Sequence, residues 1–351
     1  MKYRYPFLVL YFALAVQAGL AQNTYVPDDN FEQALIDLGY DDTLDDSVLT
    51  ANISGVTNLD VNSKSISDLT GIEGFTAITI LECSSNPLTS LDVSANTALT
   101  QLNCRNNQLT SLDVSSNTAL TELNIGGGSQ SQISTLDLSN NTALISLNTQ
   151  DILTLTSLDV SANTTLLSLG CWNNSLTTLN VSGASALTNL NCSNNSLTSL
   201  DVSNNTELTT LKCYNNELTS LDVSSNTALI ELRCEENQLT SLDLTSNIAL
   251  ANLNCSYNQL TSLNPSNTSI DQLWCNDNQL TSLDLSANTS ITYLVCSRNQ
   301  LTSLDVSNVT ALTWMTCSSN QLTTLDVSTN TALIELNCQS NQLTSLDLSS
   351  N

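Results

Sequence analysis

Hydrophobic residues return at the same positions in successive units of nearly constant length, from Ile78 to the end of the chain. The unit that begins at Leu99 reads L-T-Q-L-N-C-R-N-N-Q-L-T-S-L-D-V-S-S-N-T-A, and related units begin at residues 78, 120, 144, 166, 187, 208, 229, 250, 270, 291, 312 and 333. A fixed period of this size is typical of a solenoid, in which each unit forms one coil and stacks on the next. The sequence therefore predicts thirteen coils over residues 78–351.

Each coil contains two short segments in which apolar and polar residues alternate. In the unit at Leu99 the alternation directs Leu102 and Cys104 inward, and in its second half it directs Leu112 and Val114 inward. An asparagine follows each segment, where its amide can bond the backbone and turn the chain. We therefore expect a β-rich, right-handed coil with two parallel β-sheets.

The repeat is interrupted in three places. A glycine-rich loop, Gly126-Gly127-Gly128 followed by residues 129–132, lengthens the coil that begins at residue 120. Ile152 replaces the first asparagine of the next coil. Pro265, in the slightly shortened coil that begins at residue 250, removes a backbone donor and is expected to end the second strand there.

The residues before the repeats divide into three parts. Residues 1–21 have basic residues before a short apolar run and small residues at its end, as in a secretory signal peptide. Residues 22–55 contain a short amphipathic helix after Pro27 and are interpreted as an N-terminal cap over the apolar core. Residues 56–77 form a transitional unit, slightly longer than most of the coils that follow it.

The transitional unit and the coils after it resemble leucine-rich repeats. The pattern L-x-x-L-x-L-x-x-N-x-L is the signature of that family, the first repeat looks like the internalin type, and the 21-residue units resemble the nested variety. The opening T-Y-V-P-D-D-N-F-E-Q-A-L resembles the caps of secreted leucine-rich repeat proteins from Bacteroidetes. The resemblance implies a leucine-rich repeat solenoid, a secreted or cell-surface location in a Gram-negative bacterium, and a binding surface on the concave, first-strand face.

Composition narrows the possible functions. The chain has no histidine, so Ser-His-Asp and Cys-His catalytic groups and histidine-ligated metals are excluded, and we expect neither an enzyme nor a cofactor. The net charge is −26, and it becomes 5 − 33 = −28 once the two basic residues of the signal peptide are removed. Such a charge repels nucleic acid, and no stretch after the signal peptide is suited to cross a membrane.

The eleven cysteines occupy an inward leucine position in most coils. Free cysteine is among the most buried residue types, so we interpret them as a column of small core residues. Disulfides between coils require closer Cβ atoms than an in-register stack readily allows, and the absence of C-x-x-C pairs gives no support to zinc.

An aspartate recurs at the outward position of the second strand. These residues are Asp92, Asp113, Asp137, Asp159, Asp201, Asp222, Asp243, Asp284, Asp305, Asp326 and Asp347, with Asn180 and Asn264 in two coils. One interpretation is a solvated acidic face. The other is a row of weak calcium sites, for which Asp201, Asp222 and Asp243 are the candidates, because hard oxygen ligands suit Ca²⁺.

The outward positions of the first strand vary from coil to coil, whereas those of the second strand repeat Ser-Asp-Ser. Exposed aromatic and arginine side chains on a rigid surface are typical anchors of recognition. The candidate binding residues are Trp172, Lys212, Tyr214, Arg233, Tyr257, Trp274, Tyr293, Arg298 and Trp314. The competing interpretation is that these are solvent positions that have drifted.

The sequence therefore favours a secreted or cell-surface binding module that recognises a protein or a carbohydrate through the first-strand face. The alternative is a passive structural or spacer element of the cell surface or matrix, with weak calcium binding. Because the last coil ends at Asn351 without a cap, we also expect that the chain continues beyond it.

Overall fold

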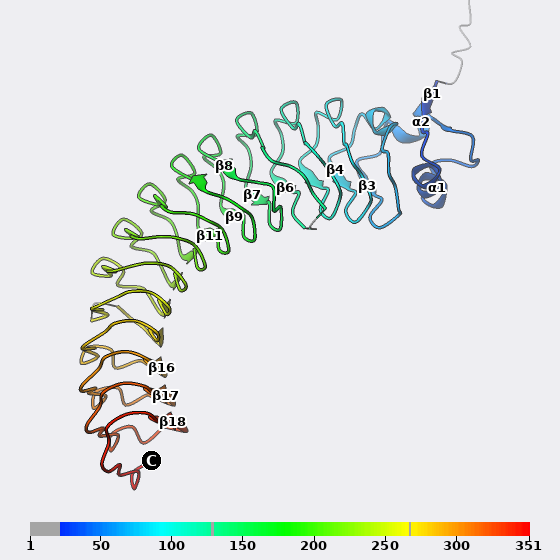
Figure 1. Ribbon diagram of the computed structural model, residues 1–351. Coiled ribbons are helices and arrows are strands. Elements are labelled where there is room, and N and C mark those ends of the chain that lie inside the picture. Colours follow the sequence, from blue (N-terminus) through cyan, green and yellow to red (C-terminus); the bar gives the residue numbers. More distant parts are fainter. Residues whose placement is uncertain (1–21, 128–129, 267) are drawn as a thin grey trace, which may run out of the picture.

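The structure is a computed structural model that describes residues 22–127, 130–266 and 268–351. It forms one elongated arc in which successive coils stack side by side, with the N-terminal cap at one end (Figure 1). The predicted signal peptide, residues 1–21, and two residues of the glycine-rich loop, 128–129, lie outside the described residues.

The cap is built from two short strands and two short helices. Strand β1 (Asn23–Tyr25) pairs antiparallel with β2 (Ser47–Leu49), and helices α1 (Asp29–Asp37) and α2 (Thr50–Ile53) accompany them. The Asp28 carboxylate accepts bonds from the first-turn amides of α1 and, through its other oxygen, from the Ser67 amide at 2.8 Å and hydroxyl at 2.7 Å. This one side chain therefore starts the helix and fastens the cap to the transitional unit, as the expected helical cap requires.

The inner side of the arc is a parallel sheet of fourteen strands among the described residues (Figure 1). The pairing is in register, so that Leu211 aligns with Leu232 and Lys212 with Arg233. The predicted leucine-rich repeat solenoid is confirmed. The strands are β3 (Asn58–Asp60), β4 (Ile80–Glu82), β5 (Gln101–Asn103), β6 (Glu122–Asn124), β7 (Ser146–Asn148), β9 (Ser168–Gly170), β11 (Asn189–Asn191), β12 (Thr210–Lys212), β13 (Glu231–Arg233), β14 (Asn252–Asn254), β15 (Gln272–Trp274), β16 (Tyr293–Val295), β17 (Trp314–Thr316) and β18 (Glu335–Asn337).

The outer side carries much less regular pairing than the two-sheet prediction implies. Among the described residues its only strands are β8 (Ser157–Asp159) and β10 (Thr178–Asn180), which pair in parallel, and one isolated bridge joins Asp92 to Asp113. Elsewhere the outer segments are extended and share fewer backbone bonds, such as that from the Gln238 amide to the Leu218 carbonyl at 2.8 Å. Because the stack bends, its outer side is spread relative to its inner side (Figure 1), and this separation limits the ladder.

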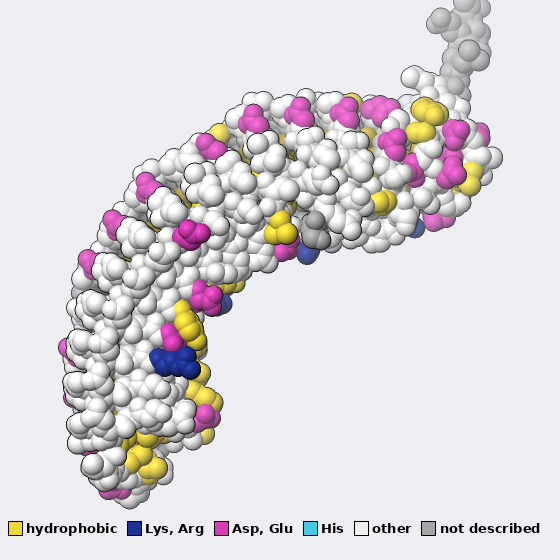
Figure 2. All heavy atoms as spheres, viewed as in Figure 1, with side chains coloured by type: hydrophobic (Ala, Val, Ile, Leu, Met, Phe, Trp, Pro, Cys, Tyr) yellow, Lys and Arg dark blue, Asp and Glu magenta, His cyan; other side chains and the backbone are white. Residues whose placement is uncertain are grey.

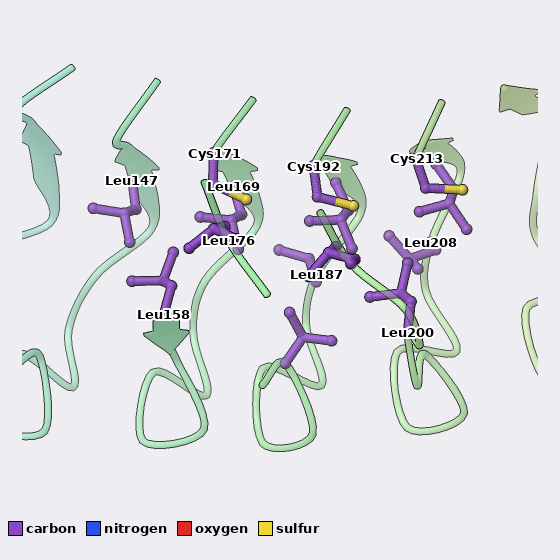
Figure 3. Packing of buried hydrophobic residues seen from close by; sticks show 14 of the residues in the cluster. Leu147, Leu158, Leu169, Cys171, Leu176, Leu187, Cys192, Leu200, Leu208 and Cys213 are labelled. Carbon is purple, nitrogen blue, oxygen red and sulfur yellow. The ribbon is translucent and has the colours of Figure 1, made fainter. Parts of the chain in front are cut away.

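The core fills the space between the two sides with one leucine layer after another, and the cysteines line up within it (Figure 3). Ten of the eleven cysteines are buried as free thiols, and Cys338 is half-buried. Burial raises the pKa of Cys104, Cys192 and Cys255 to about 12. The prediction of a buried cysteine column is confirmed, and these thiols are held in their uncharged form at neutral pH.

Two columns of asparagine close the corners of the coils. At the first corner Asn216 donates to the carbonyls of Cys192 and Cys213 and accepts from the Leu197 amide at 3.0 Å. At the second corner Asn226 donates to the Val202 and Asn205 carbonyls, while its own side-chain oxygen is buried without a partner among the described residues. The first corner is therefore the more completely bonded of the two.

Candidate functional site: the concave face of β12–β17

The aspartates of the outer side have a local structural role that the sequence interpretation missed. Each accepts a hydrogen bond from the backbone amide two residues later; the bond from Ser224 to Asp222 is 2.9 Å long. The bonds from the side chain and backbone of Ser224 lower the pKa of Asp222. Each aspartate therefore shapes a tight turn at the end of the outer segment.

No calcium ligand set accompanies this ladder in the described part of the chain. Nowhere in residues 22–127, 130–266 and 268–351 do three or more Cys, Asp or Glu residues come close enough to hold an ion together. Calcium binding by Asp201, Asp222 and Asp243 stays a prediction. The hydrogen bond in the turn already explains why aspartate recurs at this position.

The candidate recognition residues lie on the inner sheet, where the first and third residues of each strand face away from the core. Figure 2 shows apolar, basic and acidic side chains gathered along the inner edge of the lower half of the arc, whereas acidic side chains recur singly along the outer edge. The structure divides the predicted residues into two neighbouring clusters and three further positions.

The first group, called here the charged cluster, consists of Lys212, Tyr214, Glu231, Arg233 and Glu235. The Lys212 ammonium pairs with Glu231 at 3.2 Å, and the Arg233 Nε donates to Glu235 at 2.9 Å. The Arg233 guanidinium also lies over the Tyr214 ring, 4.6 Å from its centre, in a cation–π contact. Partial burial disfavours the charge on Arg233, but the bond to Glu235 together with the electrostatic attraction of Glu235, Tyr214 and Glu231 outweighs that effect and raises the pKa of the guanidinium.

The second group, called the aromatic cluster, consists of Trp274, Tyr293 and Trp314 on three successive strands. Tyr293 and Trp314 are register partners whose rings stack with centres 5.7 Å apart and planes 14° apart. The Trp274 ring is 5.0 Å from the Tyr293 ring at an angle of 40°. All three are half-buried, so they pack against one another and still present ring surface to solvent.

A hollow of about 580 Å³ separates the two clusters. Short amide side chains on β14 make the room, because Asn252 and Asn254 stand between the long side chains of β13 and those of β15. The lining residues are Glu231, Arg233, Asn252, Asn254, Gln272 and Trp274. The hollow thus offers one aromatic wall, several amide donors and acceptors, and one charge of each sign.

Of the three remaining predicted residues, Trp172 lines a smaller hollow together with Lys212 of the charged cluster. Trp172 packs over Gly170, where an added Cβ atom would collide with the indole ring. Tyr257 and Arg298 occupy the turn after the inner strand, both in the left-handed conformation with φ of 55° and 52°. Because this turn borders the inner sheet, Tyr257 and Arg298 belong to the rim of the face. Arg298 pairs there with Asp277 at 3.4 Å.

Sequence reasoning had not placed Glu235, Asn252, Asn254 or Gln272 in the site. Glu235 was recognisable, because it lies two residues beyond Arg233 with the inward Cys234 between them, so both side chains share one side of the strand. The asparagines were not, because asparagine fills the position of Asn254 in several other coils and small or polar residues fill that of Asn252 in most.

The fold and the buried cysteine column can now be compared with known proteins. The functional domain of InlJ from Listeria monocytogenes, which includes a cysteine ladder, is 38% identical to this chain with a TM-score of 0.83, over 94% of this chain and 74% of that domain. The chain belongs to the internalin-like leucine-rich repeat proteins. No family model matches the sequence.

Two further matches concern the fold and a short stretch of the sequence. An internalin, InlF, from Listeria monocytogenes strain F2365 shares the fold with a TM-score of 0.75 at 23% identity, covering 90% of this chain and 95% of that one. Internalin J of the same strain is 38% identical over 83 residues, which is 23% of this chain and 9% of that protein. The match therefore spans a small part of that curated relative. Within the described residues, no helix has the length and apolar character to cross a membrane.

Proposed function

We propose that this internalin-like protein is a recognition module that binds a partner protein through the charged cluster, the hollow and the aromatic cluster on its concave face. The observation that carries the proposal is the aromatic cluster, in which three large rings of successive strands meet on a surface whose other outward residues are mostly polar. Exposed aromatic groups of this kind are the usual energetic centres of protein interfaces.

The rigidity of the sheet supports the same proposal. Strands β12–β17 are held in register by the ladder, and the side chains of both clusters are fixed by contacts with each other. A surface that is ordered before binding loses little conformational entropy when the partner arrives, so more of the contact energy remains as affinity. The protein acts here by presentation of a preformed surface and not by catalysis.

The same proposal includes the location. A secreted or surface-exposed protein of a Gram-negative bacterium fits the leader-like residues 1–21 and the Bacteroidetes-type cap sequence. An extracellular location is also compatible with the sealed cysteines, because thiols buried in the core cannot exchange with external disulfides.

The test is capture of surface proteins by the immobilised full chain. The test variant is Trp274→Ala with Trp314→Ala, and the matched control is Asp222→Asn with Asp243→Asn on the outer side of neighbouring coils. We expect the double tryptophan variant to bind the specific partner with at least about tenfold lower affinity, because aromatic hot-spot residues each contribute about 2 kcal/mol or more.

The control variant should retain the same partner as the wild type. Equal capture by the tryptophan variant and the wild type would contradict the proposal. If the wild-type column instead retains a polysaccharide and the tryptophan variant does not, the partner is a carbohydrate and not a protein. Capture of nothing by any form would favour the passive spacer.

A further inference from the structure

We propose that the aromatic cluster receives a lysine or arginine side chain from a cationic segment of the partner protein. This inference rests on the proposed function and specifies the chemistry of the partner. It follows from an arrangement that the molecule already contains once within its own chain, in the charged cluster.

In the charged cluster a cation is held between a ring and a carboxylate. Tyr214 and Glu235 each follow the inward cysteine of their coil, so they are equivalent positions one coil apart. The Arg233 guanidinium lies 4.6 Å from the centre of the Tyr214 ring and is bonded to Glu235. The ring attracts the cation through its face, and the carboxylate neutralises it.

The aromatic cluster repeats the ring and the carboxylate but contributes no cation. Trp314 and Glu335 are register partners on β17 and β18, one coil apart, as Tyr214 and Glu235 are. A second carboxylate, Asp271, directly precedes β15 and accepts a bond from the hydroxyl of Thr292, the residue before Tyr293, at 2.6 Å. Among the described residues neither Glu335 nor Asp271 forms an ion pair.

The basic residues of this part of the face are already engaged. Lys212 pairs with Glu231, Arg233 with Glu235 and Arg298 with Asp277. Each of these pairs is neutral as a unit, so the unmatched charge beside the aromatic rings is negative. A partner cation would complete at Trp314 and Glu335 the arrangement that Arg233 completes at Tyr214 and Glu235.

The charge of the whole chain acts in the same direction. Residues 22–351 contain five basic and 33 acidic residues, a net charge of 5 − 33 = −28. A field of that sign raises the association rate of cationic partners and lowers that of anionic ones, most strongly at low ionic strength. Charge complementarity and the local geometry therefore select the same kind of partner.

Tryptophan fluorescence gives a direct test, because two of the three tryptophans are Trp274 and Trp314. Substitution of the third, Trp172→Phe, makes the emission of the full chain report on the aromatic cluster. The probes are a nine-residue peptide with three arginines separated by Gly-Ser, the same peptide with uncharged citrulline at each arginine, and the same peptide with glutamate. Titrations are run at low salt and repeated at about 0.15 M salt, where the Debye length is about 8 Å.

We expect the arginine peptide to change the emission saturably, with at least about tenfold higher apparent affinity than the citrulline peptide and no detectable binding of the glutamate peptide. Glu335→Gln with Asp271→Asn should weaken the arginine peptide about three- to tenfold and reduce the salt dependence. Asp222→Asn with Asp243→Asn, which removes the same number of charges on the outer side, should change the affinity by less than about twofold.

Equal binding of the arginine and citrulline peptides would overturn the cation inference while leaving the aromatic face as a peptide-binding surface. Absence of any emission change with the arginine peptide would also overturn it, whereas the capture experiment above decides the proposed function separately. Equal weakening by the inner and outer carboxylate variants would reduce the effect to net charge and would likewise overturn a site at the aromatic cluster.

Discussion

The two sides of each coil have the same alternation of apolar and polar residues, but they are built differently. On the inner side the leucines of the strands are almost completely buried, and Leu211 is 0% exposed. On the outer side the matching leucines are less well covered, and Leu221 of the same coil is 7% exposed. Among the described residues the inner side has a ladder of fourteen strands, whereas most outer segments have none.

This difference explains where the sequence is free to vary. On the outer side the aspartate accepts a bond from the amide two residues later, so an acceptor at this position is needed to shape the turn. On the inner side the ladder and the buried leucines hold the backbone, so the outward side chains are released from structural roles. The variable residues are therefore those that can be used for recognition without altering the coil.

The largest effect expected from this comparison concerns the two leucines of one coil. Leu211→Ala should lower the free energy of unfolding by about 3–5 kcal/mol, because the closely packed inner side cannot collapse around the cavity. Leu221→Ala should cost less, about 2–3 kcal/mol, because the spread outer side already admits some solvent. Urea unfolding followed by circular dichroism measures both, and equal losses would contradict a difference in packing between the two sides.

The next effect separates the two corners. Asn216→Ala removes three buried bonds at the first corner and should cost about 2–4 kcal/mol, since it leaves the buried Leu197 amide without a partner and takes one of two asparagine donors from each cysteine carbonyl. Asn226→Ala removes two bonds but also an unpartnered buried oxygen, so about 1–2 kcal/mol is expected. Ala184 occupies the second-corner position of an earlier coil, which indicates that this corner tolerates the change.

Thermal unfolding of the two variants, measured side by side, checks the order of these effects. A greater loss in Asn226→Ala than in Asn216→Ala would show that the unpartnered oxygen is satisfied in solution, for example by buried water. That outcome would remove the distinction between the corners.

Much of the fold was predictable because each coil repeats the same physical problem. Period-2 alternation placed Leu102 and Cys104 in the core, and the asparagine after them at the corner, without any knowledge of the whole shape. The short second sheet was not predictable in this way. Curvature is a property of the stack, and residues such as Leu112 and Leu102 look equivalent in sequence although they lie on sides with different spacing.

The binding face was predictable as a surface but not as a site. The vertical pairing of Tyr293 with Trp314 followed from equal positions in successive coils, and the structure stacks their rings. The hollow beside Trp274 could not be predicted from the sequence. Asn252 and Asn254 differ from other asparagines only because the neighbouring strands on both sides carry longer side chains. The left-handed turn that holds Tyr257 was also hidden, since that residue type gives no indication of a positive φ.

The smallest effect expected is the pH dependence of the outer turns, and it separates the turn from the calcium interpretation of the same aspartates. Hydrogen bonds from the Ser224 side chain and backbone lower the pKa of Asp222 below its ordinary value in the folded protein. A carboxyl with a lowered folded pKa stabilises the fold above its unfolded pKa of about 3.9. That contribution is lost as the pH falls through the folded value, so acid should weaken the turns from about pH 4 downward.

The variant Asp201→Asn, Asp222→Asn, Asp243→Asn keeps the acceptor and removes the titration, as Asn180 does naturally when it accepts from the Ser182 amide at 3.1 Å. Its melting temperature should therefore match the wild type near neutral pH and fall slightly less below about pH 4. Replacement of the same three residues by alanine should destabilise at every pH, because the turn loses its acceptor. If instead millimolar Ca²⁺ raises the melting temperature of the wild type but not of the asparagine variant at matched ionic strength, the outer side binds ions, and the contrast between a structural side and a recognition side no longer holds.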